Sequence, residues 1–98
     1  MSLPVILRHE AEIDIQEARD QLAAVRVGLG NQFLARVCEV LARIETMAEL
    51  YGKVWEDVRA ARLKHFRYIV YFFVLADRVE VLAVLHGARA PSAWQSRG

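Results

Sequence analysis

The chain has 98 residues, of which 55% are hydrophobic and 26% charged. This length predicts a single domain spanning residues 1–98, and the composition excludes a disordered, collagen-like or low-complexity chain. One cysteine excludes an intramolecular disulfide, and the longest uncharged apolar run, residues 68–76, is far shorter than the ~20 residues that cross a bilayer. We therefore expect a cytoplasmic protein with no membrane partner.

Charge is distributed unevenly along the chain, although the net charge is only +1. Residues 1–57 carry six basic and ten acidic side chains, whereas residues 58–98 carry seven basic and two acidic ones. In a small domain this asymmetry predicts one positive face, suited to phosphates or to an acidic protein. The small net charge argues against non-specific binding to duplex nucleic acid.

Apolar residues at helical spacing predict two helices joined by a link that contains two glycines. The stripe of the first helix comprises Ala11, Ile15, Ala18, Leu22 and Val25. The stripe of the second helix comprises Leu34, Val37, Leu41, Ile44 and Ala48. Gly28 ends the first helix, and Asn31 is suited to cap the start of the second. We expect an antiparallel helical hairpin whose apolar side packs against a sheet.

The hydrophobic period changes from 3.6 to 2 in the second half of the chain. We predict strands over 58–63, 68–75 and 79–86, with the last two joined as a hairpin, and one further strand over 4–8. In the last strand, strict alternation places Val79, Val81, Ala83 and Leu85 on one face. The predicted fold is α+β, in the order β-α-α-β-β-β, with the helical hairpin on one face of a small, mainly antiparallel sheet. The other face is expected to be open, and the tail to form a turn or one helical turn.

Several segments, taken in this order and spacing, resemble the ParE/RelE superfamily of bacterial toxins from type II toxin–antitoxin modules, which serve in plasmid stabilisation. The resemblance covers nearly the whole chain. It rests on Ala11–Ile15, Gly28–Phe33, Val58–Arg59, Phe66–Tyr71 and Val79–Arg89. Arg67 stands where a Pro is commoner in the family, a departure expected to affect only a turn.

The resemblance implies a toxin that inhibits growth and is neutralised by a cognate antitoxin encoded in the same operon. ParE-like members poison DNA gyrase, whereas RelE-like members cut messenger RNA on the ribosome. We favour the ParE-like reading, in which the toxin binds an essential target. A ribosome-dependent endoribonuclease is the alternative, and a degenerate module that only binds antitoxin is the second. Whether the protein is an enzyme, and whether the toxin–antitoxin complex is a homo-oligomer, stay open.

Basic residues of the second half are the candidates for contact with the target. The predicted target-binding residues are Arg59, Arg62, Lys64, Arg89, Trp94 and Arg97. For the nuclease alternative, the resemblance implies a cluster of cations with a titratable group, for which the chain offers Arg59, Arg62, Lys64, His86 and Arg89. Gly87 stands where such nucleases have an Arg. The tail offers Trp94, which can stack on a base but cannot exchange a proton.

Ordinary structural roles compete with these functional ones. Arg59 and Arg62 point to opposite faces of an ideal strand, so at most one of them joins a flat basic patch unless a bulge intervenes. Trp94 equally suits packing of the tail onto the sheet, and Arg89 suits an anchor that bonds backbone carbonyls. The three histidines show no metal-ligand spacing, and no nucleotide-binding motif occurs. We therefore predict neither a metal nor a cofactor.

Overall fold

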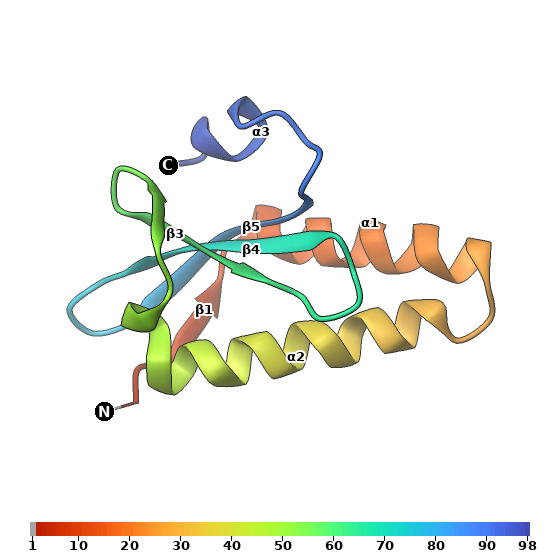
Figure 1. The fold of residues 1–98 in the computed structure, drawn as a ribbon, viewed down its shortest axis with the longest axis horizontal. Coiled ribbons are helices and arrows are strands. Elements are labelled where there is room, and N and C mark those ends of the chain that lie inside the picture. Colours follow the sequence, from red (N-terminus) through yellow and green to blue (C-terminus); the bar gives the residue numbers. More distant parts are fainter. Residues whose placement is uncertain (1) are drawn as a thin grey trace.

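A computed structural model describes residues 2–98, which form a sheet with helices on one side and the C-terminal tail on the other (Figure 1). In chain order the elements are β1 (Val5–Leu7), α1 (His9–Val25), α2 (Leu29–Met47), the 3-10 turn η1 (Ala48–Leu50), β2 (Lys53–Trp55), β3 (Val58–Arg62), β4 (Tyr68–Val74), β5 (Val79–His86) and α3 (Ser92–Gln95). No helix within residues 2–98 has the length and apolar character needed to cross a membrane.

The strands form a five-stranded sheet in the order β1-β5-β4-β3-β2. β1 runs parallel to β5, and every other neighbouring pair is antiparallel. The α+β class and the helical hairpin on a mainly antiparallel sheet are confirmed. β2 was not predicted, because three residues are too few to show a period of two. The tight turn between β2 and β3 places Glu56 at a positive φ of 48°.

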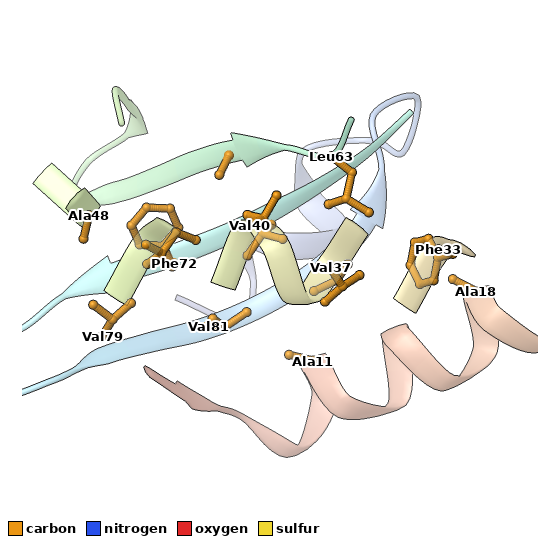
Figure 2. Packing of buried hydrophobic residues seen from close by; sticks show 14 residues of the cluster. Ala11, Ala18, Phe33, Val37, Val40, Ala48, Leu63, Phe72, Val79 and Val81 are labelled. Atoms are coloured by element: carbon orange, nitrogen blue, oxygen red, sulfur yellow. The ribbon is translucent and has the colours of Figure 1, made fainter. Parts of the chain in front are cut away.

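The helix side of the sheet holds the larger apolar cluster (Figure 2). From α2 it receives Phe33, Val37, Val40 and Ile44, which recur at the spacing of one helical face. α1 contributes the small residues Ala11 and Ala18, which are both buried. From the sheet, side chains such as Phe72, Val79 and Val81 point at these helices (Figure 2). The predicted stripes are largely confirmed, but Val25 at the end of α1 is 76% exposed.

The two glycines of the hairpin link are required for different reasons, one for its backbone conformation and the other for close packing. Gly28 precedes α2 with a φ of 85°, a left-handed conformation that residues with a Cβ rarely adopt. Gly30 lies inside the first turn of α2, where a Cβ would come within 2.8 Å of the Arg19 carbonyl oxygen of α1. α2 therefore begins at Leu29, two residues before the expected cap at Asn31.

The expected strict alternation in β5 is wrong in its second half. Tyr71 pairs with Ala83, but Phe72 pairs with Val81, so Leu82 is the extra residue of a β-bulge. Beyond the bulge the facing of the side chains is reversed. Leu82, Ala83 and Leu85 therefore lie in the cluster on the tail side, whereas Val84 lies in the helix-side cluster.

The expectation that the second face of the sheet is open is also wrong. Trp94 of α3 is buried there and stacks on Tyr71 of β4, with ring centroids 4.3 Å apart and planes inclined by 14°. The Trp55 ring of β2 meets Trp94 edge-on at 6.1 Å. One helical turn, as expected for the tail, thus suffices to cover the middle of a small sheet.

Candidate functional site

A hollow at one end of the sheet gathers several of the predicted site residues. β3 ends there at Arg62, β4 begins at Tyr68, and β5 ends at His86, which pairs with Tyr68. The hollow measures about 520 Å³ and is lined by these three side chains together with Arg67 of the β3–β4 connection. The same connection lies beside the end of β5 in Figure 1. Strand pairing therefore brings together residues that are 24 positions apart.

Cations around this end of the sheet have no anionic partner. Arg62, Lys64, Arg67 and Arg89 are exposed, and none of them forms an ion pair within residues 2–98. Three of the four are predicted site residues, whereas Arg67 is an addition. The sequence does carry a signal for Arg67, because residues 58–76 contain four cations and no Asp or Glu. Unpaired positive charge at one end of a nearly neutral domain marks a surface that can bind anions.

Arg59 lies away from this hollow, on the helix side of β3. Its guanidinium donates hydrogen bonds to the carbonyl oxygens of Glu49, at 3.2 Å, and Tyr51, at 2.7 Å. These bonds fasten the chain after α2 to the sheet. Arg62 lies on the opposite, tail-covered side of the sheet, where it lines a hollow together with Tyr71 and Trp94. The expectation that the two arginines face opposite ways is confirmed.

A backbone amide bonds one of the two ring nitrogens of His86. Its Nδ1 accepts a hydrogen bond from the Ala88 N–H at 3.0 Å, so the neutral ring carries its proton on Nε2. The ring also meets Tyr68 edge-on, with centroids 5.4 Å apart. In this arrangement the neutral ring can donate a hydrogen bond from Nε2 but offers no free ring nitrogen to accept a proton.

The C-terminal tail is anchored by Arg97, not by Arg89 as the sequence suggested. Arg97 bonds the Asp14 carboxylate at 2.6 and 3.2 Å, and the Leu82 carbonyl oxygen at 3.3 Å. The Asp14 carboxylate also accepts the Val84 N–H of β5 at 3.0 Å. The hydrogen bond to Asp14 raises the pKa of Arg97 above its usual value.

Trp94 and Arg97 therefore make their main contacts within the chain itself. The Trp94 ring lies against Tyr71, and burial raises the pKa of the Tyr71 phenol. The remaining predicted residue, Arg89, lines a smaller hollow whose wall also includes Asp14 and Glu17 of α1. Contact of Trp94, Arg97 and Arg89 with a target stays a prediction. No pattern in the sequence indicates the ion pair between Arg97 and Asp14, because 83 residues separate the partners.

Within residues 2–98, no three or more acidic, histidine or cysteine side chains come together in a group that could hold a metal ion.

The fold defines this chain as a small α+β domain with a helical hairpin and a capped sheet. Residues 5–91 match the family model described as ParE toxin of the type II toxin–antitoxin system parDE, and the chain belongs to this family. Among solved structures it is similar to one described as the chromosomal ParDE toxin–antitoxin system from P. aeruginosa. The TM-score is 0.75 at 14% identity, over 87% of this chain and 96% of that one. No curated protein sequence matches the chain.

Proposed function

We propose that this toxin arrests growth by binding an essential target, with DNA gyrase as the candidate that the family suggests. Membership of the ParE toxin family supports this proposal. We further propose that a cognate antitoxin, encoded in the same operon, neutralises the toxin. Of the predicted contact residues, Arg62, Lys64 and Arg89 form no ion pair within residues 2–98, and unlike Arg59 their side chains bond no backbone carbonyl there.

The hydrogen bond at Nδ1 of His86 is the observation that favours binding over catalysis. Cleavage of RNA by attack of a 2′-hydroxyl needs a group that takes up the proton of that hydroxyl. The ring nitrogen that could accept it, Nδ1, is occupied by the Ala88 amide. The unpaired arginines and lysine nearby can hold an anionic surface without any such proton transfer. The ribonuclease alternative would need the His86 bond to break when the target binds.

Exposed apolar residues near the end of α2 suggest where an antitoxin could bind. Leu50 is 80% exposed, and Met47 and Leu50 line a hollow of about 570 Å³ with Leu3 and Leu75. A protein chain that covers such surface removes apolar area from water, the main source of association energy. Since the tail already covers the second face of the sheet, we propose this end of the molecule for the antitoxin. The number of copies in the complex stays open.

The test is controlled expression with two readouts taken in parallel. Gyrase poisoning predicts double-strand breaks and an SOS response soon after induction, with ribosome-bound messenger RNA left intact. Rapid cleavage of messenger RNA without DNA damage would overturn the proposal in favour of the ribonuclease. Growth that continues normally, while the chain still binds the product of the neighbouring gene, would instead identify a module without toxicity.

A second arm uses the unpaired charges and a matched control. Arg62→Gln and Lys64→Gln should each weaken growth arrest in graded steps, because each removes one charge-assisted contact worth ~1–3 kcal/mol. Arg43→Gln removes the same charge from the exposed surface of α2 and should leave growth arrest unchanged. If all three variants stay fully toxic, the basic end is not the target-binding surface.

A further inference from the structure

The three most exposed large apolar side chains within residues 2–98 lie just outside the two ends of α2. Val25 and Val27, before its start, are 76% and 96% exposed, and Leu50, after its end, is 80% exposed. The next most exposed, Val54, reaches only 52%. None of the first three belongs to either apolar cluster. Apolar side chains gathered at two places on the surface indicate two contact sites.

The first place is the tip of the helical hairpin, residues 23–27, which Figure 1 shows beyond the edge of the sheet. All five residues are exposed, and Arg26 carries the only charge among them. Residues 21–38 contain no Asp or Glu. The left-handed backbone of Gly28 and the close packing of Gly30 on α1 fix the shape of the tip. The hairpin tip is therefore an apolar projection with a positive charge.

The second place is a hollow of about 570 Å³ at the opposite end of α2. Its large apolar lining residues are Leu3, Met47, Leu50 and Leu75. The charged side chains in the lining are those of Glu45 and Glu49, and neither forms an ion pair within residues 2–98. This acidic hollow offers a concave apolar surface with negative charge, which is the complement of the hairpin tip.

The hairpin tip cannot reach the acidic hollow of its own chain. α2 has 19 residues, and a helix of that length separates its two ends by about 28 Å. Figure 1 shows the link between the helices at one end of the molecule and the end of α2 at the other. A contact between the two sites must therefore join two copies of the chain.

We propose that the hairpin tip of one copy binds in the acidic hollow of a second copy. Val25 and Val27 enter the apolar surface around Leu50, and Arg26 pairs with the glutamates of the hollow. Because the two surfaces differ, the contact is head-to-tail, and a pair keeps one free tip and one free hollow at which the assembly grows or closes into a ring. This inference goes beyond the proposed function, since it names a partner that is neither the target nor the antitoxin.

Charge favours this arrangement over a symmetric one. Two tips in contact would bring one Arg26 against the other, and two hollows in contact would bring glutamates together. Like charges at an interface oppose binding, whereas opposite charges select the partner and its orientation. The contact is limited to one hollow, so it belongs to the small class of interfaces, and association should be weak and reversible.

Sedimentation equilibrium of the purified full chain, without antitoxin, tests the proposal. We expect an average mass that rises above that of the monomer as the protein concentration increases. Val27→Asp places a carboxylate on the tip and Leu50→Asp places one in the hollow, and each should weaken self-association about tenfold or more. Val54→Asp makes the same change on β2 and should leave self-association unchanged. All three positions are exposed, so the variants should keep the thermal unfolding midpoint of the parent chain.

A mixture of the two defective variants distinguishes a head-to-tail contact from a symmetric one. Val27→Asp keeps an intact hollow, and Leu50→Asp keeps an intact tip. An equimolar mixture should therefore form pairs that stop at two copies, although neither variant associates alone. With a symmetric contact, one of the two variants would associate alone. Arg26→Glu should also weaken association, and Glu49→Arg in the same chain should restore part of it.

Several results would overturn the inference. They are a mass that stays that of the monomer at millimolar concentration, an equal loss in Val54→Asp, full self-association of either defective variant alone, and a mixture that forms no pairs. A chain that stays monomeric yet arrests growth on induction would refute the self-association and leave the toxin assignment intact. Assemblies that an excess of antitoxin does not dissolve would instead overturn the antitoxin site proposed above and leave the head-to-tail contact standing.

Discussion

The helix-covered and tail-covered faces of the sheet bury similar kinds of residue but are assembled in different ways. On the helix side, side chains from two long helices mesh with regularly alternating strands. On the tail side, one short helix places Trp94 over Tyr71, and a bulge in β5 adds Leu82 to the apolar surface. The first face depends on many repeated contacts. The second depends on a few large ones.

The two faces also differ in how far polar contacts hold them in place. The helix side needs few ion pairs, because α1 and α2 are held by continuous apolar contact. The tail has too little apolar area to hold itself, so Arg97 bonds Asp14 and Arg8 bonds the Arg97 carbonyl oxygen at 2.6 Å. Arg8 and Arg97 are thereby used inside the molecule, whereas Arg62, Lys64, Arg67 and Arg89 form no ion pair within residues 2–98.

The largest expected effect lies on the helix side. Phe33→Ala should lower the free energy of unfolding by about 3–5 kcal/mol, because Phe33 is fully buried and packs edge-on against Phe66 and Tyr68. Chemical denaturation measures the change. Val27→Ala, at an exposed position in the hairpin link, is the control and should stay within ~0.5 kcal/mol of the parent. Equal effects of the two substitutions would contradict the described core.

The next effect tests whether the tail layer depends on one ring. Trp94→Ala should cost about 2–4 kcal/mol, since it removes both the buried area and the stacking on Tyr71. Hydrogen exchange should speed up for the tail and the neighbouring part of β5, while the amides of α2 stay protected. If α2 loses protection to the same degree, the two faces form one cooperative unit and the comparison fails.

A smaller effect is expected from the ion pair that anchors the tail. Arg97→Ala should cost about 1–3 kcal/mol, because the Asp14 side chain is only 8% exposed and loses its charged partner. A double-mutant cycle with Asp14→Ala should give a coupling energy above ~0.5 kcal/mol. Simple additivity of the two substitutions would show that the contact contributes nothing to anchoring.

The smallest effect concerns acid stability at Glu80, near the start of β5. Hydrogen bonds from Arg8 and Arg78 lower the pKa of Glu80, so the ionised form is favoured in the folded state. The stabilisation is present above the pKa that Glu has in the unfolded chain, and it is lost as the pH falls through the lowered pKa. The difference in unfolding free energy between the parent chain and Glu80→Gln should therefore shrink in acid. A constant difference across that range would contradict this.

The two faces also differ in how well the sequence predicts them. Stripes such as Val37 and Ile44 on α2 follow from periodicity alone, because a long helix repeats its signal over several turns. The bulge at Leu82 and the short strand β2 leave no periodic trace. The pairing of Arg97 with Asp14 joins the two ends of the chain, so only the folded structure reveals it.

The sequence likewise predicts some features of the candidate site and not others. The sequence indicates a basic half and the opposite facing of Arg59 and Arg62, which strand geometry fixes. It does not indicate which cations are already bonded. Arg59 and Arg97 turn out to hold backbone carbonyls or a carboxylate, whereas Arg62 and Arg67 are free of ion pairs within residues 2–98.

A reaction of purified gyrase with supercoiled DNA tests most directly the proposal that this ParE-family toxin acts by binding gyrase. In the presence of the toxin we expect loss of supercoiling activity together with accumulation of cleaved DNA, and addition of the cognate antitoxin should reverse both. Gyrase that keeps full activity at saturating toxin, with ribosome-bound messenger RNA cut in a parallel reaction, would contradict the account.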